Sequence, residues 1–498
     1  MSWSRSFVVL AVGLAAFVAV PAHHALAVTY TVDTTSDANL TACNFAVDDD
    51  CSLRGAINNA NVNPGGDSIA FDLGPGTPTI NVGSTGLGDL ATIASGQPVT
   101  IDGNTGGATR IELNGTTAAA NGLDFLGGSS VIESLVINRF PSRGIVLRSS
   151  FNTVKNSIIG LDATGTVDLG NTLDGISIVA SQNTIGGPNP GDRNIISGNE
   201  RHGINVGGDD HVIAGNYIGP DITGTLDRGN SMNGINLFGT GSGDGTERNI
   251  IGGTTAVERN VISGNNGNGI YLTSGTGCTP DPCQGPARNM VQGNYIGTNA
   301  AGDGYLGNTG HGIELDDANV NCIGGVVIST DCGPIAGGGN VISGNGGDGI
   351  KNTFPVQDNR IYGNFIGTNA AGTADLGNTG NGITLEGFQH TVGETVPEAR
   401  NVIAGNDANG IVVASNPFGL YRVEITGNFI GVAAAGVAPI ANAGDGIVVQ
   451  ASGARVCIGA ITSGPPNHTC VPTVGAGNVI SANGSDGIQI AADSNGNT

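Results

Sequence analysis

Two groups of residues in this sequence are of the types that perform acid–base chemistry. Asp209-Asp210 is a pair of adjacent carboxylates, and His311 stands between two glycines in the stretch 306–315. Hydrolysis of a glycosidic bond uses two carboxyl groups held about 5–9.5 Å apart. About a hundred residues separate the aspartate pair from His311. Whether these residues can act together therefore depends on how the chain is folded.

The dominant feature of the sequence is an internal repeat. The pattern Asn, three residues, Gly and Ile occurs in ten copies at intervals of 28 to 43 residues. The copies are Asn171–Gly175, Asn199–Gly203, Asn230–Gly234, Asn265–Gly269, Asn308–Gly312, Asn345–Gly349, Asn378–Gly382, Asn406–Gly410, Asn442–Gly446 and Asn483–Gly487. Two further short apolar segments lie in each interval, such as 249–253 and 260–265. Three short strands separated by Gly and Asn turns predict one coil of a solenoid.

Stacked coils also account for the composition. The chain has 87 Gly, 4 % aromatic and 12 % charged residues, whereas ordinary globular chains are about 25 % charged. We expect Ile and Val to stack in inward columns, and Asn side chains to hydrogen-bond between identical turns. Since neighbouring coils lie about 4.8 Å apart, roughly a dozen coils predict a rod of about 60 Å. The prediction is an all-β parallel β-helix with three short strands per coil and the excess length in loops.

The repeat explains why a histidine occurs at position 311 without assigning it a catalytic role. The residue before Gly-Ile is Asn, Asp or His in every copy: Asp174, His202, Asn233, Asn268, His311, Asp348, Asn381, Asn409, Asp445 and Asp486. These types are enriched at positive φ. We therefore expect His311 to fill a left-handed turn position that Asn fills in other coils.

The N-terminus has the features of a secretory signal over residues 1–27. Arg5 precedes an apolar run from Phe7 to Val20, and Ala25-Leu26-Ala27 is a small-x-small cleavage site. A retained membrane anchor is the alternative, although the run is short for a span. We expect a secreted or cell-surface protein with a cap and entry region over 28–100 and repeats over 101–498. No C-terminal cap pattern is visible, which suggests either a fragment or capping by self-association.

The charge and the cysteines fit an exported protein. The formal net charge is −23, and such an acidic surface repels phosphate backbones, which argues against a nucleic-acid partner. No segment after the signal is apolar enough to span a membrane. The eight cysteines form four local pairs, which favours disulfides over the alternative of zinc sites. The pairs are Cys43 and Cys51, Cys278 and Cys283, Cys322 and Cys332, and Cys457 and Cys470.

Two family resemblances follow from these motifs. The segment 51–61, Cys-Ser-Leu-Arg-Gly-Ala-Ile-Asn-Asn-Ala-Asn, resembles the CSLREA motif of bacterial exported β-helix proteins, with Gly55 in place of Glu. The repeats resemble the right-handed parallel β-helix of the pectin-lyase-like superfold. The resemblance implies the fold and export, but no particular activity. In the front motif, the spacing of Leu53, Ala56, Ile57 and Ala60 predicts a short capping helix, pinned by a Cys43–Cys51 bridge and weakened by Gly55.

Enzymes of this superfold carry recognisable clusters, which we looked for. Polygalacturonase-type glycosidases combine Asn-x-Asp, Asp-Asp, Gly-His-Gly and Arg-x-Lys on adjacent coils. Here Asp209-Asp210 and His311 are expected about 15 Å apart along the axis, and no Arg-x-Lys exists. A lyase needs an Arg or Lys base, and the chain has only two lysines. Asp316-Asp317 and the pair Asp445 and Asp486 could bind Ca²⁺ weakly, the alternative being solvated turn carboxylates; otherwise we expect no cofactor.

A row of polar residues is the best candidate for ligand binding. The residue after each Gly-Ile should point outward, and the middle members of this row are polar and varied: Asn205, Asn236, Tyr271, Glu314, Lys351 and Thr384. One aromatic face with amide and hydroxyl donors is typical of a shallow carbohydrate track. The alternative is a solvent-facing ladder in which Glu314 and Lys351 pair across coils. The loops around Cys278–Cys283 and Cys322–Cys332 are expected to flank this row.

Because no convergent group of acid, base and cation is visible, the sequence favours a non-enzymatic role. We expect an exported rod acting in cell-surface adhesion, matrix contact or glycan binding, with a polysaccharide or surface glycan as partner. One alternative is a polysaccharide lyase or glycoside hydrolase with unrecognised active residues. Another is a structural repeat module of a larger assembly.

Overall fold

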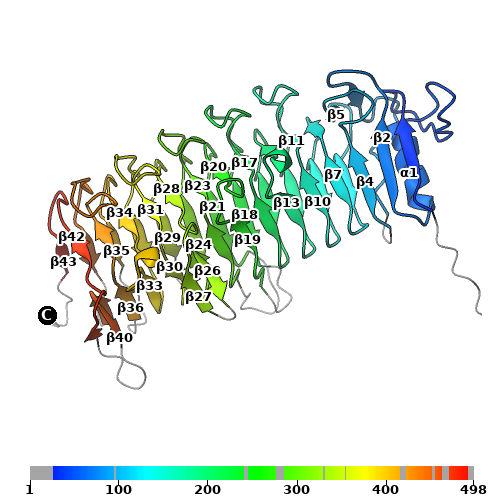
Figure 1. Cartoon of the computed structure of the whole chain (residues 1–498). Helices are drawn as coiled ribbons and strands as arrows, with labels where there is room; N and C mark the ends of the chain where they lie inside the picture. The colour runs from blue at the N-terminus through cyan, green and yellow to red at the C-terminus, as the bar shows by residue number, and fades with distance from the viewer. Residues whose placement is uncertain are drawn as a thin grey trace, which may run out of the picture.

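The chain folds as an elongated stack of coils with three parallel sheets along its axis (Figure 1). The computed structural model describes residues 26–94, 97–239, 245–275, 285–328, 331–353, 355–414, 422–450, 455–462 and 470–491. The architecture is a right-handed parallel β-helix, so the predicted fold is confirmed. Within the described residues, no helix combines the length and apolarity that a membrane span needs.

The first sheet has 14 strands and begins with the first strand of the described chain. Its strands are β1 (Thr29–Val32), β2 (Asp67–Phe71), β4 (Val99–Asp102), β7 (Val131–Glu133), β10 (Thr153–Lys155), β13 (Thr184–Gly186), β16 (Val212–Ala214), β19 (Ile250–Gly252), β22 (Met290–Gln292), β25 (Cys322–Ile323), β30 (Arg360–Ile361), β33 (His390–Val392), β36 (Arg422–Ile425) and β39 (Arg455–Ile458).

The second sheet has 13 strands, most of them only two residues long. Its strands are β3 (Thr79–Asn81), β5 (Ile111–Asn114), β8 (Leu135–Asn138), β11 (Ile158–Ile159), β14 (Ile195–Ile196), β17 (Tyr217–Ile218), β20 (Val261–Ile262), β23 (Tyr295–Ile296), β28 (Val341–Ile342), β31 (Phe365–Ile366), β34 (Val402–Ile403), β37 (Phe429–Ile430) and β42 (Val479–Ile480).

The third sheet has 12 strands and contains all ten Gly-Ile copies of the repeat. Its strands are β6 (Leu123–Phe125), β9 (Ile145–Leu147), β12 (Ile176–Ile178), β15 (Ile204–Val206), β18 (Ile235–Phe238), β21 (Ile270–Thr273), β24 (Ile313–Asp316), β29 (Ile350–Thr353), β32 (Ile383–Leu385), β35 (Ile411–Val413), β38 (Ile447–Val449) and β43 (Ile488–Ile490).

The turns between the first two sheets carry further short strands and helical turns. Two antiparallel hairpins project there, formed by β26 (Gly325–Ile328) with β27 (Asp331–Pro334) and by β40 (Ala460–Thr462) with β41 (Cys470–Pro472). Both hairpins lie at the lower edge of the rod in Figure 1. Two short 3-10 helices, η1 (Pro190–Asp192) and η2 (Pro397–Ala399), occupy the same turn in other coils.

The interior of the rod is a single apolar core. Alternate residues of each strand turn inward, so Ile176, Ile204 and Ile235 stack in register and are fully buried. One cluster of buried side chains extends from Val32 to Val449. A single coil could not bury these residues alone, which is why the fold requires stacking.

Asparagine side chains join the coils at each corner, as expected from the sequence. Asn265 donates from Nδ2 to Asn308 Oδ1 at 2.9 Å and to the Ile218 carbonyl at 3.1 Å, while its own Oδ1 accepts from Asn230 Nδ2 at 2.9 Å. The same bonds continue along one ladder: Asn171, Asn199, Asn230, Asn265, Asn308, Asn345, Asn378, Asn406, Asn442 and Asn483. Similar ladders run at the other two corners. The asparagine oxygen also accepts from a main-chain amide one coil earlier, as Asn265 Oδ1 does from the Asn230 amide at 3.3 Å. Its Nδ2 gives the Ile218 carbonyl a second hydrogen bond beside that from the Ser263 amide.

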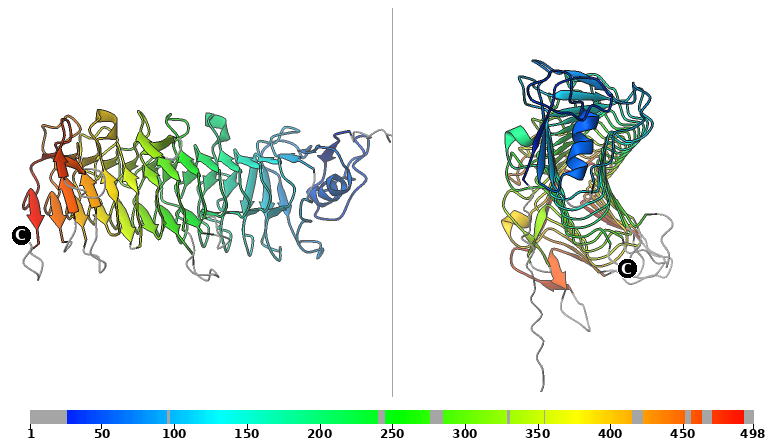
Figure 2. Two further views of the ribbon diagram at one scale, coloured as in Figure 1. Left: turned by 90° about the horizontal axis from the view of Figure 1, so that it is seen from below. Right: turned by 90° about the vertical axis from the view of Figure 1, so that its right-hand side faces the viewer.

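A short helix covers the N-terminal end of the stack (Figure 2). Helix α1 (Leu53–Val62) begins at Ser52, whose hydroxyl oxygen accepts a hydrogen bond from the Gly55 amide at 3.0 Å. The Arg54 guanidinium is buried and pairs with Asp37 at 2.8 Å. A Cβ at Gly55 would collide with the carbonyl oxygen of Leu40. Gly55 is therefore required for the close approach of the helix, a benefit that its low helix propensity did not indicate.

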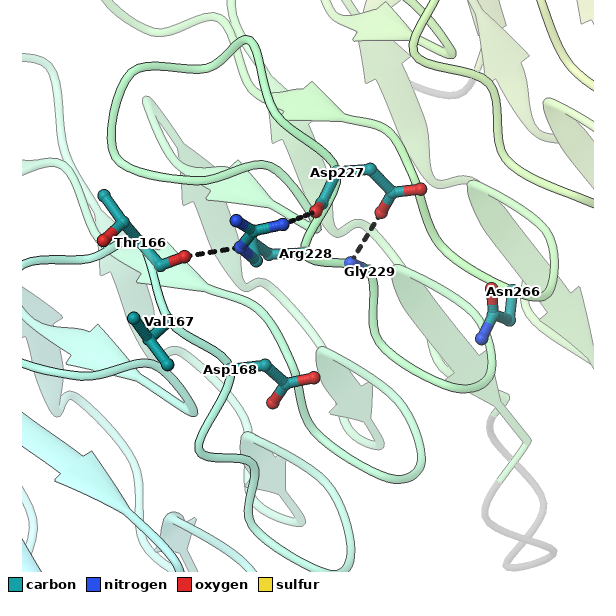
Figure 3. Close-up of a pocket in the computed structure, with 7 residues that line it drawn as sticks. All are labelled: Thr166, Val167, Asp168, Asp227, Arg228, Gly229 and Asn266. Carbon is teal, nitrogen blue, oxygen red and sulfur yellow. Dashed lines mark hydrogen bonds between the residues drawn. The ribbon is translucent and has the colours of Figure 1, made fainter.

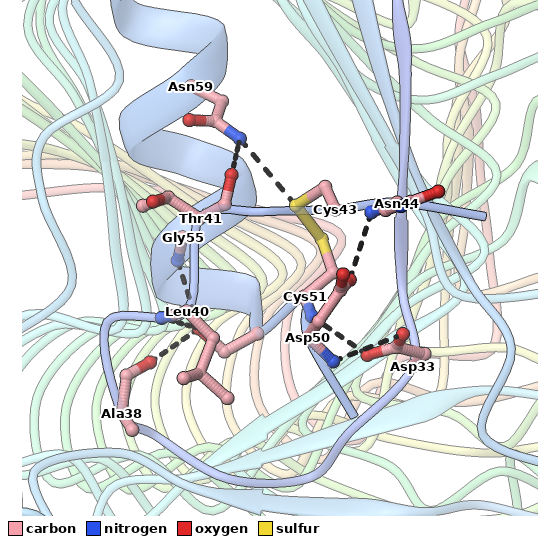
Figure 4. The surroundings of a disulfide bond; sticks show 11 residues. Asp33, Ala38, Leu40, Thr41, Cys43, Asn44, Asp50, Cys51, Gly55 and Asn59 are labelled. Carbon is pink, nitrogen blue, oxygen red and sulfur yellow. Dashed lines mark hydrogen bonds between the residues drawn. A yellow bond between two sulfur atoms is a disulfide. The ribbon is translucent and has the colours of Figure 1, made fainter. Parts of the chain in front are cut away.

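The predicted Cys43–Cys51 disulfide pins this helix to the preceding loop (Figure 4). Asp33 accepts a hydrogen bond from the Cys51 amide at 2.9 Å. From the helix side, Asn59 donates to the Thr41 carbonyl at 2.8 Å. The bridge therefore closes a loop whose two ends are already held by the sheet and by α1.

Five loops on alternate coils form an ordered layer outside the 13-stranded sheet. Each is closed by an antiparallel bridge, and we call them the ridge loops: 161–168, 220–227, 298–305, 368–375 and 432–439. Successive loops are joined by main-chain hydrogen bonds, such as that from the Ala300 amide to the Gly224 carbonyl at 2.9 Å. They pack over outward apolar residues, including Tyr217 and Tyr295. They form the row of loops at the upper edge of Figure 1.

One polar pair lies inside the apolar core. Asn352 occupies the inward position between Leu315 and Leu385, and its Nδ2 lies 3.3 Å from His390 Nδ1. His390 Nε2 lies 2.8 Å from the Glu386 carbonyl, so it carries the ring proton and Nδ1 accepts. Burial lowers the pKa of His390 to about 4, outweighing hydrogen bonds with the Glu386 and Asn359 main chains.

This histidine should make stability depend on pH. Because its folded pKa of about 4 lies below the unfolded value of about 6.5, its contribution is fully present above pH 6.5. It is lost as pH falls from about 6.5 to 4, by up to about 3 kcal/mol. His390→Asn should remove this part of the pH dependence, measured as urea midpoints between pH 7.5 and 4. Parallel pH curves for the wild type and H390N would contradict the assignment.

Loss of one ladder asparagine should destabilise the rod strongly. Asn265→Ala removes the acceptor of the Asn230 main-chain amide in a buried corner. It also removes one hydrogen bond each from the Ile218 carbonyl and the Asn230 side chain. We expect a loss of about 3 kcal/mol in the free energy of unfolding, measured with urea. The exposed neighbour Asn266 provides the control, because Asn266→Ala should change the free energy by less than about 0.5 kcal/mol. Equal effects of the two substitutions would contradict a structural role for the ladder.

Candidate functional site

The residues that follow each Gly-Ile pair form one outward column on the 12-stranded sheet. Strand pairing places all six predicted ligand-binding residues in a single row: Asn205, Asn236, Tyr271, Glu314, Lys351 and Thr384. Asn236 and Thr384 are each only 8 % exposed. The accessible part of the row is therefore centred on Tyr271, Glu314 and Lys351, which are half-buried.

A second outward column lies two residues further along the strands. Strands β18, β21, β24 and β29 are four residues long, and their last residues are in register: Phe238, Thr273, Asp316 and Thr353. The Gly-Ile register predicts only the first outward residue of each strand. The two-residue period of a strand was the signal that could have identified the second column.

Hydrogen bonds connect the two columns into one cluster. The Tyr271 hydroxyl donates to Asp316 Oδ2 at 2.8 Å, across neighbouring strands. Glu314 accepts from Asn268 Nδ2 at 2.7 Å and from the Thr353 hydroxyl at 3.3 Å. The expected ion pair between Glu314 and Lys351 does not form among the described residues, because the glutamate is held by these two donors instead.

The electrostatics of the cluster keep Tyr271 protonated. Burial, followed by the carboxylates of Asp316 and Glu314, raises the pKa of Tyr271 to about 12, against a hydrogen bond with Thr273 that lowers it. At neutral pH the phenol is therefore a neutral hydrogen-bond donor. Lys351 on the adjacent strand β29 adds a cation to the same face.

Two carboxylates, a phenol and an ammonium group lie on one outer face of three neighbouring strands. Glu314 and Asp316 lie two residues apart on one face of β24, which places their α-carbons about 7 Å apart. Tyr271 and Lys351 flank this pair from the coils on either side. The repeat register had already placed Tyr271, Glu314 and Lys351 in one row, and the second column adds Asp316.

His311 has a structural role, but not for the predicted reason. None of the ten residues that precede Gly-Ile has a positive φ. Instead, the side chains of the first nine, Asp174 to Asp445, each accept a hydrogen bond from the main-chain amide of the next coil. His311 Nδ1 accepts from the Asp348 amide at 2.9 Å, and the His311 amide donates to Asn268 Oδ1 at 2.7 Å. Asn, Asp and neutral His share an acceptor at this position, which explains their alternation.

The other predicted carboxylate groups lie away from this cluster or serve the coil ladders. Asp209 and Asp210 are at a corner of the rod, where Asp210 pairs with Arg248 at 2.8 Å. Asp445 accepts from the Asp486 amide at 2.7 Å, as a ladder member. Among the described residues, no group of three or more His, Cys, Asp or Glu side chains is arranged to hold a metal ion.

Three of the four predicted cysteine pairs are disulfides: Cys43–Cys51, Cys322–Cys332 and Cys457–Cys470. Cys278 and Cys283 lie outside the described residues. The Cys322–Cys332 bridge closes the β26–β27 hairpin, which packs beside β22 and β25 of the 14-stranded sheet. The expectation that it flanks Tyr271 and Glu314 is therefore wrong, because those residues belong to another sheet.

Comparison with known proteins relates the chain to solved β-helices at low similarity. No family model and no curated protein match the sequence. The A-module of the Azotobacter vinelandii mannuronan C-5 epimerase AlgE4 aligns at 14 % identity, over 84 % of this chain and 95 % of that one, with a TM-score of 0.40. The AlgE6 A-module aligns at 12 % identity, over 89 % and 94 %, with a TM-score of 0.37. The pectate lyase Pel9A aligns at 12 % identity, over 87 % and 78 %, with a TM-score of 0.29. Likeness at this level identifies no site residues.

The ladder role of His311 predicts which substitutions are tolerated. His311→Asn restores the acceptor found in other coils and should change the free energy of unfolding by less than about 0.5 kcal/mol. His311→Leu leaves the Asp348 amide without its acceptor and should cost about 1–3 kcal/mol. Hydrogen exchange of the Asp348 amide should accelerate in H311L alone. Equal losses in both variants would show that the ring, rather than its acceptor, matters.

Proposed function

We propose that this protein is an exported polysaccharide-active β-helix that hydrolyses glycosidic bonds at the Tyr271–Lys351 cluster. The observation that carries the proposal is the convergence of Glu314, Asp316 and Tyr271 on one face of two adjacent strands, with Lys351 on the next. The disulfides support export, because such bonds persist in oxidising compartments.

The hydrogen bonds suggest a role for each residue. Asp316 accepts a hydrogen bond from the Tyr271 hydroxyl at 2.8 Å. We assign it as the base or nucleophile and Glu314 as the proton donor to the leaving oxygen. Tyr271 also offers its ring face to a sugar.

A neutral glycan suits this site better than a uronate chain. The formal net charge is −23, and Glu314 and Asp316 add two carboxylates at the cluster itself. Such a surface disfavours approach of a polyanion. The aligned solved structures are named as a mannuronan epimerase and a pectate lyase, but the proposal rests on the cluster rather than on those names.

Glycan recognition without turnover is the second candidate. It is favoured by the fixed partners of both carboxylates, since Asn268 and Thr353 hold Glu314 while Tyr271 holds Asp316. A recognition surface benefits from such rigid acceptors. In this case a glycan would bind along the same row and remain intact.

The test is a depolymerisation screen with neutral glucans, pectate, alginate and chondroitin, read by new reducing ends and unsaturated products. We expect turnover of a neutral glucan, with Glu314→Gln and Asp316→Asn each at least about 100-fold slower. Asp407→Asn, an exposed carboxylate outside the cluster, should match the wild type. Equal turnover by E314Q, or no turnover of any polymer, would overturn the hydrolase proposal. Binding that is retained by the wild type and lost in Tyr271→Ala would then support recognition.

A further inference from the structure

A pocket of about 430 Å³ opens between the first two ridge loops (Figure 3). Its lining consists of Thr166, Val167, Asp168, Asp227, Arg228, Gly229 and Asn266. The two loops are in contact where the Ile222 amide donates to the Gly165 carbonyl at 3.0 Å, and the pocket opens beside the residues that close them. The volume lies within the range of small-molecule sites, about 300–1,000 Å³.

Arg228 is an exception to the repeat at this pocket. The residue that follows the closing bridge of each ridge loop is aliphatic in the other four loops, as Leu169, Leu306, Leu376 and Ile440. Leu376 and Ile440 are buried there. The fold therefore accepts an aliphatic side chain at this position, and the charge of Arg228 is not needed for stacking.

The guanidinium lies between the two loops. Its Nε donates to the Thr166 carbonyl of the first loop, and Nη1 donates to the Asp227 carbonyl at 2.6 Å (Figure 3). Nη2 has no hydrogen-bond partner among the described residues. The two main-chain contacts fix the direction of the guanidinium and leave that amino group for a ligand.

Two carboxylates line the same cavity without pairing with Arg228. Asp168 accepts from the Gly170 amide at 3.1 Å, and Asp227 accepts from the Gly229 amide at 2.8 Å, each through Oδ1. Within the described part of the chain, the second oxygen of each carboxylate has no partner. A cation and two anions that line one pocket without forming an ion pair leave several donors and acceptors available to a ligand.

We propose that this pocket binds a neutral sugar unit, with Asp168 and Asp227 accepting from its hydroxyl groups and Arg228 donating to a ring or hydroxyl oxygen. Hydroxyl groups both donate and accept, so one sugar can satisfy the guanidinium and the carboxylates together. Val167 supplies an apolar contact and the Asn266 side chain a further amide. An anionic sugar would meet two carboxylates for one cation.

The position of the pocket relates it to the proposed reaction site. Asn266 lies on the coil that carries Tyr271, five residues earlier in the chain. A glycan lying along the outward row could therefore place a branch in the pocket. The inference rests on the proposed function in taking a saccharide as ligand, and it deepens that function by indicating a branched neutral glycan.

The test is saturation-transfer NMR with methyl glycosides of neutral hexoses and pentoses, and with methyl glucuronide for comparison. We expect binding of at least one neutral glycoside, weakened at least tenfold in Arg228→Leu and in Asp168→Asn. R228L introduces the residue type of the other ridge loops, so folding should be retained. Asp375→Asn, at the matching bridge of a loop that continues with Leu376, is the control and should bind as the wild type does.

The outcomes separate this inference from the proposed function. Unchanged binding in R228L, preference for the glucuronide, or no binding of any neutral glycoside would overturn the pocket. Arg228-dependent binding without turnover of any polysaccharide would uphold the pocket while the hydrolase proposal fails. Turnover that depends on Glu314 but not on Arg228, with no glycoside bound, would support the hydrolase proposal and overturn the pocket.

Discussion

The structure depends on satisfying main-chain polar groups at the corners of each coil. Three turns per coil bury main-chain amides that no strand pairs. Asparagine provides the acceptor at these corners: Asn265 Oδ1, for example, accepts from the main-chain and side-chain amides of Asn230 on the preceding coil, and its own side-chain amide donates to Asn308 on the next. The resulting one-per-coil spacing imposes the Asn and Gly-Ile pattern on the sequence. The outward positions of the strands are not needed for these corner hydrogen bonds, so their residue types can vary.

The difference between these corner positions and the outward positions explains what could be predicted from the sequence. The fold and the outward row from Asn205 to Thr384 follow from the repeat and from strand alternation, and three cysteine pairs from local spacing. A structural role for His311 was predicted correctly, but the predicted cause, a positive φ, was wrong. Turns with positive φ and hydrogen-bond acceptors both favour Asn, Asp and His, so the residue types alone do not distinguish the two causes. Three members of the cluster, Tyr271, Glu314 and Lys351, were predicted in the outward row, whereas Asp316 was not placed beside them because only one outward residue was taken from each strand. The ridge loops were expected only as excess length, since their stacking arises from main-chain contacts between alternate coils.

The residues to which we assign a function lie at positions that take no part in the asparagine ladders. On β21, β24 and β29, the outward residues are chemically active types, with Tyr271 neutral and donating to a carboxylate. On the second ridge loop, Arg228 replaces an aliphatic residue and creates a charged pocket. Both features are local exceptions in a repeat that otherwise serves stability. Departure from the repeat is thus the most useful guide to chemistry in this rod.

The most direct measurement is a crystal structure of the E314Q variant with a bound neutral oligosaccharide. The account predicts a sugar ring against Tyr271, with a glycosidic oxygen between the side chains at 314 and 316. A saccharide seated on another sheet, or lying across the row with its linkage remote from both carboxyl positions, would contradict the account.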